Sequence, residues 1–294
     1  MTHLKISIVT PSYNQGQYLE DTILSVLGQQ YPNLEYIIYD GGSTDESVNI
    51  IKKYENQISY WQSQRDKGQS DAINQGFSRS TGEILMWLNS DDILMPNVLN
   101  LIANQHIAKG DGIFFGNCIH FKELNPSGVH ASGSNVIAKS NSVSLDLSDY
   151  IIQPCSFWSR KVWNDIGKLD ENFHFGFDWE WFLRAQKNGI PFHAINKPIS
   201  MYRFHEEHKS GTGGKKRQEE ILKIYQVYNP FYANLYRLMM NETFIFSFSE
   251  KVLFRLFRLM SRKEFSKIQF LKIIKNRQYA QYSANDIQTI IGML

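Results

Sequence analysis

The stretch Ile84–Asp92, which reads Ile-Leu-Met-Trp-Leu-Asn-Ser-Asp-Asp, decides the fold expected for this sequence. Its five apolar residues, 84–88, predict a buried β-strand, and two carboxylates, Asp91 and Asp92, follow closely. A carboxylate near a low-dielectric interior is costly unless another group offsets its charge, and a metal ion with oxygen ligands is a natural partner. The end of this strand is therefore a candidate functional site.

Strand-like and helix-like segments alternate on both sides of this stretch. Apolar runs predict strands at 6–10, 36–39, 58–61, 84–88 and 112–116, and helical spacing predicts helices at 17–29, from Ser43 onward, at 70–80 and at 96–107. Alternation of this kind predicts an α/β fold with a mainly parallel sheet flanked by helices. Ligands of such sheets bind beyond the carboxyl ends of the strands, where four polar clusters fall: 11–14, 40–42, 66–68 and 89–92.

The pattern loosens after Asn117. Residues 117–149 are rich in Ser, Gly and Asn, which we interpret as irregular or antiparallel structure. Further along we expect strands at 156–159, 192–194 and 199–202, helices at 160–166 and 178–188, and only helices after residue 215.

Composition and charge limit the class of protein. A chain of 294 residues with 42% hydrophobic and 20% charged residues suits a folded protein with a large core. The two cysteines, Cys118 and Cys155, lack the spacing of a metal site or a disulfide framework. No apolar run of about 18 residues predicts a membrane span, and the first residues lack a signal pattern. We therefore expect a cytoplasmic location.

The charge is unevenly distributed. Residues 215–278 hold 14 Lys/Arg against 5 Asp/Glu, whereas the rest of the chain holds 17 against 24. Lys251, Arg255, Arg258 and Arg262 form one helical stripe between apolar residues, which is typical of a helix that lies on a membrane surface. The alternative is a helix packed on the catalytic domain with its charges in solvent. Nucleic-acid binding is disfavoured because no recognised nucleic-acid module is present.

The polar clusters suit a nucleoside diphosphate. Asp40 can accept a hydrogen bond from a base N–H, the two following glycines allow close backbone approach, and Tyr13 can stack on the base. Asp91 is the best candidate for direct metal coordination. The alternatives are a tight turn with a helix cap at 40–43 and a solvated turn at 91–92.

Four motifs carry a family resemblance: Thr10–Asn14, Tyr39–Asp45, Asp66–Ala72 with Asn74, and Leu88–Asp92. In this order they resemble the family-2 glycosyltransferases of the GT-A (Rossmann-like) fold, and the resemblance covers roughly residues 5–210. It implies a nucleotide-sugar donor, a divalent cation (Mn²⁺ or Mg²⁺) and inversion at the anomeric carbon.

The resemblance also assigns roles to residues. The donor nucleotide would be held by Thr10, Pro11, Tyr13, Asp40, Asp66, Lys67, Gly68, Asn89 and Ser90, and the metal by Asp91 and His205. The family's acidic signature is typically Asp-x-Asp, whereas this chain has Asn89 at the first position. Because Asn brings no negative charge, we expect weaker metal affinity or a changed donor preference.

The segment 177–184 resembles the one that supplies the family's catalytic base. Its usual Glu-Asp pair reads Phe177-Asp178 here, so Asp178 would take the proton of the acceptor hydroxyl. Asp178 can also be read as the cap of the following helix, and the two roles are compatible. Trp158 and Trp179 could line the acceptor pocket, although aromatic residues are more often part of a core.

We thus expect a catalytic domain at 1–214, with a nucleotide-sugar-binding half (1–116) and an acceptor-binding half (117–214). Residues 215–294 would form a basic helical region that associates with membrane. The expected activity is transfer from a UDP-sugar to a hydroxyl of a glycan or lipid-linked glycan, in O-antigen or capsule synthesis at the cytoplasmic face of the inner membrane.

Two alternatives remain open. A catalytically impaired membrane scaffold is favoured by Asn89 and Phe177, which depart from the family pattern. A sugar-phosphate nucleotidyltransferase is disfavoured because residues 11–17 contain no basic residue to hold a triphosphate.

Overall fold

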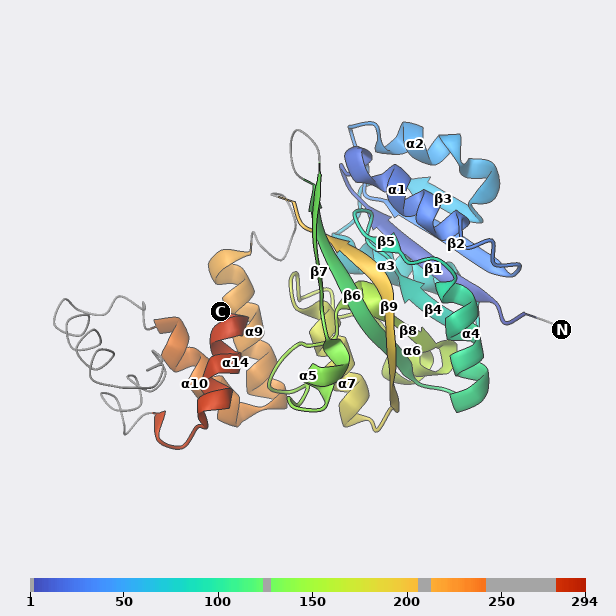
Figure 1. Cartoon of the computed structure of the whole chain (residues 1–294). Helices are drawn as coiled ribbons and strands as arrows, with labels where there is room; N and C mark the ends of the chain where they lie inside the picture. The colour runs from blue at the N-terminus through green and yellow to red at the C-terminus, as the bar shows by residue number, and fades with distance from the viewer. Residues whose placement is uncertain (1–2, 124–127, 206–212, 242–278) are drawn as a thin grey trace. The chain divides into compact units, whose positions relative to one another are not determined.

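The computed structural model describes residues 3–123, 128–205, 213–241 and 279–294. The chain forms two compact units. The first unit comprises residues 1–142 and 150–213, and the second comprises residues 143–149 and 214–294 (Figure 1).

The first unit is built on one sheet. Its strands are β1 (Ile6–Ser12), β2 (Leu34–Asp40), β3 (Tyr60–Ser63), β4 (Ile84–Trp87), β5 (Ile93–Leu94), β6 (Ile113–Glu123), β7 (Val129–Gly133), β8 (Ser156–Ser159) and β9 (Phe192–Arg203). They follow the order β3-β2-β1-β4-β8-β6-β9-β5, with β7 paired to β6. The predicted α/β fold is confirmed.

The two halves of the sheet differ in strand direction. Strands β1 to β4 are mutually parallel. In the other half β8 runs antiparallel to both neighbours, β5 and β7 pair antiparallel to β9 and β6, and only β6 and β9 are parallel. The sheet is therefore parallel in its N-terminal half and mixed beyond it. The predicted boundary at 116/117 falls inside β6, so both predicted halves share this sheet.

Helices of the first unit connect these strands. They are α1 (Gly16–Leu27), α2 (Ser47–Lys53), α3 (Gln69–Arg79), α4 (Val98–Lys109), α5 (Val136–Ser140), α6 (Arg160–Ile166) and α7 (Phe177–Lys187), with short 3-10 helices at Glu55–Gln57 and Gln153–Cys155. Helix α2 does not begin at Ser43 as expected. The Ser43 hydroxyl donates to Asp40 instead, and α2 starts after Glu46.

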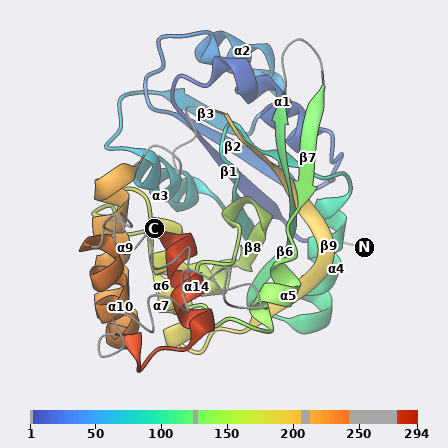
Figure 2. The ribbon, with the colours of Figure 1, turned by 60° about the vertical axis from the view of Figure 1, so that its left-hand side comes forward.

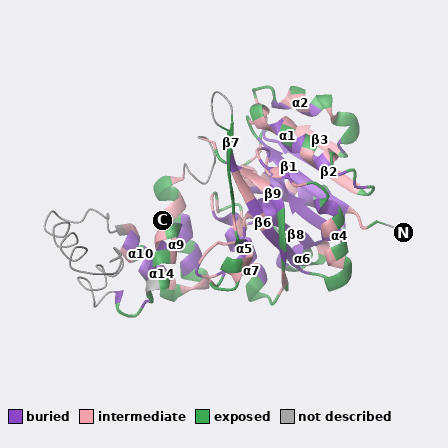
Figure 3. Cartoon of the chain, viewed as in Figure 1, coloured by how far each residue is buried: buried purple, intermediate pink, exposed green. Residues whose placement is uncertain are grey.

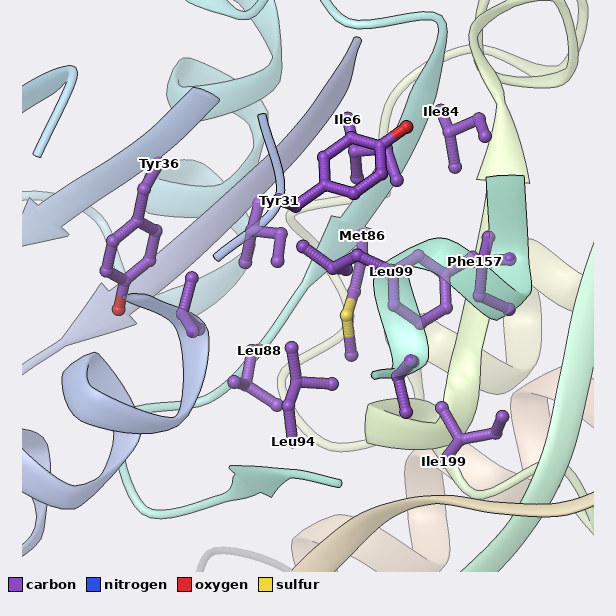
Figure 4. Close-up of a cluster of buried hydrophobic side chains, with 14 of the residues drawn as sticks. Ile6, Tyr31, Tyr36, Ile84, Met86, Leu88, Leu94, Leu99, Phe157 and Ile199 are labelled. Atoms are coloured by element: carbon purple, nitrogen blue, oxygen red, sulfur yellow. The ribbon is translucent and has the colours of Figure 1, made fainter. Parts of the chain in front are cut away.

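Alternation along the parallel strands supplies two buried faces. On one face Ile6, Ile8 and Met86 pack with α1 and α4 in one apolar cluster (Figure 4). On the other face a Cβ at Gly76 of α3 would come 2.4 Å from Val9, so α3 lies directly on β1. Because both faces are covered, the strands read as continuous apolar runs.

Two expectations for the second half of this unit are wrong. Residues 192–203 form one long strand rather than two, because β9 follows β6 through a bulge near Asn117 (Figures 1 and 2). Residues 136–140 form a short helix, which starts where Asn135 accepts a hydrogen bond from Ala138. The antiparallel expectation holds for β7, which is exposed along its whole length (Figure 3).

The second unit is helical among its described residues. Helices α9 (Gly214–Tyr228), α10 (Pro230–Asn241) and α14 (Ala284–Met293) pack with residues 143–149. Tyr225 is fully buried and its hydroxyl donates to the Leu147 carbonyl at 2.7 Å. The segment 143–149, expected in the acceptor-binding half, therefore belongs to this unit.

The predicted membrane-surface helix at 251–262 lies outside the described residues. In the described parts of the chain, no helix has the length and apolarity needed to span a bilayer.

Candidate functional site

Four strand ends meet at one edge of the sheet. In register, Ser12 of β1 lies beside Asp40 of β2, and Asp40 lies beside Ser63 of β3. The Gly41 N–H donates to the Ser12 carbonyl at 2.8 Å, so the turn after β2 stays against the end of β1. The polar clusters predicted after β1, β2 and β3 therefore lie at the same edge. The fourth cluster follows β4, which is the parallel neighbour of β1 on its other side.

Asp40 organises the turn that follows β2. Its side chain is buried, and Oδ2 accepts from the Gly42 and Ser43 N–H groups at 3.1 and 2.8 Å and from the Ser63 hydroxyl at 2.6 Å. Oδ1 accepts from the Ser43 hydroxyl at 2.5 Å. A carboxylate held by this many donors has a fixed orientation, which is a requirement for selective recognition of a base.

Asp66 lies directly against this turn. A Cβ at Gly41 would meet Asp66 Oδ2 at 2.9 Å, so a side chain at this position would displace the Asp66 carboxylate. The Gly68 N–H donates to Asp66 Oδ1 at 2.8 Å. Burial, with the negative charges of Asp71 and Asp40, raises the pKa of Asp66. A hydrogen-bond donor on a ligand would therefore be stabilised at this position.

The end of β1 supplies an exposed aromatic ring. Thr10 and Pro11 are buried, whereas Tyr13 is 62% exposed. Asn14 joins this end to the neighbouring loop, because its N–H donates to the Ser43 hydroxyl at 2.7 Å and its Oδ1 accepts from the Thr44 N–H at 2.9 Å. Tyr13 thus sits on a fixed loop with its ring open to a ligand. Lys67 is also exposed.

Asn89 is the centre of an amide network rather than a free polar group. Its Oδ1 accepts from Gln69 Nε2 at 2.8 Å, and its Nδ2 donates to Asp92 Oδ2 at 3.1 Å and to Gln153 Oε1 at 3.3 Å. Gln153 in turn donates to the Trp87 carbonyl at 2.8 Å. Asn89 therefore ties the N-terminus of α3 to the turn after β4.

Asp92 is the buried member of the carboxylate pair. It is 1% exposed, and its oxygens accept from Asn89 and, at 3.4 Å, from the Arg203 N–H. Burial, together with the charge of Asp91, raises the pKa of Asp92 well above its usual value. Ser90 is buried as well. Asp92 is thus a structural residue of this turn.

Asp91 is the outward member, and it faces His205. Asp91 Oδ2 lies 3.0 Å from His205 Nε2, although the two residues are 114 positions apart in sequence. Two neighbouring ligands of an octahedral ion at about 2.1 Å are about 3.0 Å apart. A carboxylate oxygen is a ligand that suits Mn²⁺ and Mg²⁺, and an imidazole nitrogen is a ligand of transition-metal ions. The pair therefore fits a divalent cation.

The protein would supply few of the ligands of such a metal centre. Within residues 3–123, 128–205, 213–241 and 279–294, no group of three or more His, Cys, Asp or Glu side chains could hold a metal. A cation at Asp91 and His205 would need further oxygen ligands from water or from a bound diphosphate, as is common for sites that bind phosphates.

Asp178 lies in the first turn of α7. The N-cap position of this helix is Gly176 rather than Asp178, but Asp178 Oδ1 accepts a hydrogen bond from the Trp179 N–H of the first turn at 2.9 Å. A negative charge in the first turn is favourable there. Phe177 is buried and packs on Trp87 of β4 with ring centroids 6.0 Å apart. This contact places the start of α7 beside the strand that leads to Asp91.

The expected acceptor role of two tryptophans does not fit the structure. Trp158 is 0% exposed and Trp179 is 1% exposed. Trp158 packs against Trp87, Trp181 and Phe77, with ring centroids 4.9 to 5.7 Å apart. A fully buried ring offers no face to a sugar, so both residues belong to the core under α7.

Arg203 and Tyr18 were not singled out from the sequence. The Arg203 side chain is 2% exposed, and its Nε donates to the Asp91 carbonyl at 3.2 Å. The Tyr18 ring lies 4.6 Å from the His205 ring. No local pattern singles out Arg203, because β9 ends at this residue and its contact with Asp91 spans 112 positions of sequence.

Comparison with known proteins identifies the family to which this arrangement belongs. The sequence model of "Glycosyl transferase family 2" matches residues 7–167, which is more than half of the chain. An uncharacterized glycosyltransferase of Rickettsia felis is 30% identical over 220 residues, which cover 70% of this chain and 35% of the relative. The chain thus spans about a third of the length of such relatives.

Further matches extend over most of the chain. The GalNAc(5)-diNAcBac-PP-undecaprenol β-1,3-glucosyltransferase of Campylobacter jejuni is 26% identical over 81% of this chain and 75% of its own length. S. aureus TarS, solved with UDP-GlcNAc, superposes with a TM-score of 0.61 at 17% identity and covers 99% of this chain and 90% of its own. A mannosyltransferase of Pyrobaculum calidifontis, solved with GDP-Man and Mn²⁺, gives 0.59 at 12% identity over 100% of this chain and 74% of its own. At such identities these two structures show the shared GT-A fold.

Proposed function

Because the chain belongs to glycosyltransferase family 2, we propose that it transfers a sugar from a nucleoside-diphosphate donor to a hydroxyl of a glycan or lipid-linked glycan. One observation carries this proposal. The parallel strands β1, β2 and β3 end next to Tyr13, Asp40 and Asp66 at one edge of the sheet, and the neighbouring parallel strand β4 ends four residues before Asp91.

The donor nucleotide would lie across this edge. Asp40, fixed by four hydrogen bonds, and Asp66, next to Gly41, would accept hydrogen bonds from the base. Tyr13 would cover the base with its exposed ring. The N3–H of a uracil base could donate to one of these carboxylates, and we propose a UDP-sugar as donor. The UDP-GlcNAc bound to TarS supports this choice.

The charge of the diphosphate would be neutralised by a divalent cation that Asp91 and His205 hold. A divalent cation bound there would supply electrostatic stabilisation of the departing nucleoside diphosphate. Asn89 would hold the turn in place, because its Oδ1 accepts from Gln69 and its Nδ2 donates to Asp92 and Gln153. We propose Mn²⁺ over Mg²⁺ because one of the two ligands is an imidazole.

Asp178 would act as the general base. In the first turn of α7 it would accept the proton of the acceptor hydroxyl as that oxygen attacks the anomeric carbon from the side opposite the leaving group, which inverts the configuration. General-base help is worth on the order of 10²–10⁴-fold in rate. The GalNAc(5)-diNAcBac-PP-undecaprenol glucosyltransferase supports a lipid-linked glycan as acceptor, and hence a role in surface polysaccharide synthesis at the cytoplasmic face of the inner membrane.

The test is ligand binding followed by turnover. A thermal-shift screen of UDP- and GDP-sugars, each with and without Mn²⁺, should show one donor that raises the unfolding temperature only with metal, because a ligand that binds the native state stabilises it. Asp178→Asn should keep that shift and lose turnover. Absence of a shift with every nucleotide sugar would contradict the proposal.

A further inference from the structure

Two further residues contact the Asp91–His205 pair. Arg203 contacts Asp91, and Tyr18 contacts His205. The Arg203 Nε–H donates to the Asp91 carbonyl at 3.2 Å, and the Tyr18 ring packs on the His205 ring at 4.6 Å. The Arg203 guanidinium lies 4.8 Å above the same Tyr18 ring. The four residues therefore form a closed circuit of contacts, in which Asp91 takes part through both its carbonyl and its carboxylate.

The guanidinium of Arg203 is deeply buried. Its side chain is 2% exposed, and it lies between the rings of Tyr18 and Phe121, at 4.8 and 4.7 Å. A buried cation is costly unless it is paired. Arg203 donates to Asp21 of α1 at 2.8 Å and to Glu123 at the end of β6.

These bonds use the fork geometry of arginine. One planar group reaches α1, the end of β6 and the Asp91 carbonyl at the same time. In addition, the Arg203 backbone N–H donates to Asp92. Lysine has one charged nitrogen with no fixed plane, so it cannot make these three bonds together.

From this geometry we infer that Arg203 and Tyr18 are positioning residues of the diphosphate and metal site. Arg203 holds the main chain of Asp91, and Tyr18 sets the ring plane of His205, so that the carboxylate and imidazole face each other before any ligand arrives. The inference rests on the proposed function, because it takes the Asp91–His205 pair to be a metal site. Loss of the partners that orient metal ligands typically reduces metal affinity by about 10–100-fold.

The experiment compares Arg203→Lys and Tyr18→Leu with two controls. Arg160→Lys is the matched arginine control, since Arg160 is half-buried and donates to the Gly82 carbonyl at 2.7 Å and to the Ser80 hydroxyl at 2.8 Å, away from the pair. Tyr18→Phe keeps the ring against His205. Thermal unfolding of all four variants identifies any that fail to fold. If Arg203→Lys does not fold, the milder substitutions at Tyr18 still test the inference.

Two readouts follow. In the metal-free protein, the His205 Hε1 resonance, assigned with His205→Gln, should shift or split in Arg203→Lys, which keeps the Tyr18 ring, and stay unchanged in Arg160→Lys and Tyr18→Phe. In Tyr18→Leu the lost ring current moves this resonance in any case, so a split resonance is the diagnostic result there. Electron paramagnetic resonance of free Mn²⁺ in the presence of UDP should show about 10–100-fold weaker binding in the first two variants only.

The possible failures are distinguishable. A His205 resonance that is unmoved in folded Arg203→Lys and unsplit in folded Tyr18→Leu, or equal loss of Mn²⁺ binding in Arg160→Lys, would overturn the positioning roles. A wild-type protein that binds no Mn²⁺ with UDP or GDP would overturn the metal-dependent function, and the resonance would still decide whether Arg203 and Tyr18 set the ring of His205.

Discussion

Asn89→Asp restores the acidic residue that the family pattern has at this position, and we expect it to harm the protein. Asn89 Nδ2 donates to Asp92 Oδ2 at 3.1 Å, so the substitution places a carboxylate oxygen where a donor stood. Asp92 is 1% exposed and both of its oxygens accept hydrogen bonds. The substitution therefore removes the hydrogen that Asn89 donates and places a second carboxylate against a buried one.

The magnitude follows from this separation. Two unit charges 3.1 Å apart repel by about 5 kcal/mol at an effective dielectric constant of 20. The pair can lower that cost by taking up one proton, which costs at most about 4 kcal/mol at pH 7 for an aspartate of ordinary pKa. The hydrogen bond to Gln153 is also lost, worth about 1 kcal/mol. Since burial already raises the pKa of Asp92, we expect a net destabilisation of about 2–4 kcal/mol.

The assay is thermal unfolding across pH, with Asn117→Asp as control. Asn117 donates to Asn196 Oδ1 rather than to a carboxylate, so its substitution adds the same charge without a facing acid. At pH 7.5 the unfolding temperature of Asn89→Asp should fall by roughly 5–15 °C. The loss should shrink toward pH 5, because the folded pair binds a proton that the unfolded chain does not, so stability rises as pH falls.

Two results would refute this reasoning. An Asn89→Asp protein with the wild-type unfolding temperature at pH 7.5 would mean that Asp92 does not need the amide. Tighter Mn²⁺ binding in this variant would mean that the missing charge, and not the amide network, sets the metal affinity.

Three further outcomes are expected. Asp178→Asn should reduce kcat by on the order of 10²–10⁴-fold, with donor affinity changed less than about 3-fold, as measured by steady-state kinetics and calorimetry; loss of donor affinity would contradict its role as base. Although burial opposes it, hydrogen bonding lowers the pKa of Glu35 from 4.5 to about 2, so its stabilising effect is present above pH 4.5 and is lost as pH falls toward 2. Glu35→Gln should accordingly flatten the decline of the unfolding temperature over that range, and an unchanged pH profile would rule this out. Gly76→Ala should destabilise the protein by about 1–3 kcal/mol in urea unfolding, because the new Cβ would lie 2.4 Å from Val9, and wild-type stability would show that α3 can move off β1.

Some of the fold followed from local pattern alone. The apolar run at 84–88 became β4 at Ile84–Trp87, and the predicted helix at 17–29 became α1 at Gly16–Leu27. Both predictions depend on hydrophobic periodicity within one segment, which is visible in the sequence without knowledge of the tertiary structure. By contrast, Ser43 has the spacing of a helix cap and yet bonds Asp40, because this carboxylate, three residues earlier at the end of β2, competes for its hydroxyl.

The errors have a common physical origin. Trp158 was expected at the acceptor, but its strand β8 lies between β4 and β6, where both faces are covered. The break expected near residue 196 is a bulge within β9, because pairing with β6 continues on both sides of it. In each case the outcome depends on which strands become neighbours, and that is a tertiary property.

By itself the sequence determined the order of elements and the positions of the polar clusters at strand ends, because alternating strands and helices force a parallel sheet whose carboxyl ends share one edge. Only the tertiary structure decided which side chains meet there. Asp91 and His205 are 114 residues apart, and Arg203 lies 182 residues from Asp21. Contacts over such separations depend on packing of the whole unit, so no local pattern could have assigned Arg203 to the site or Asn89 to an amide network.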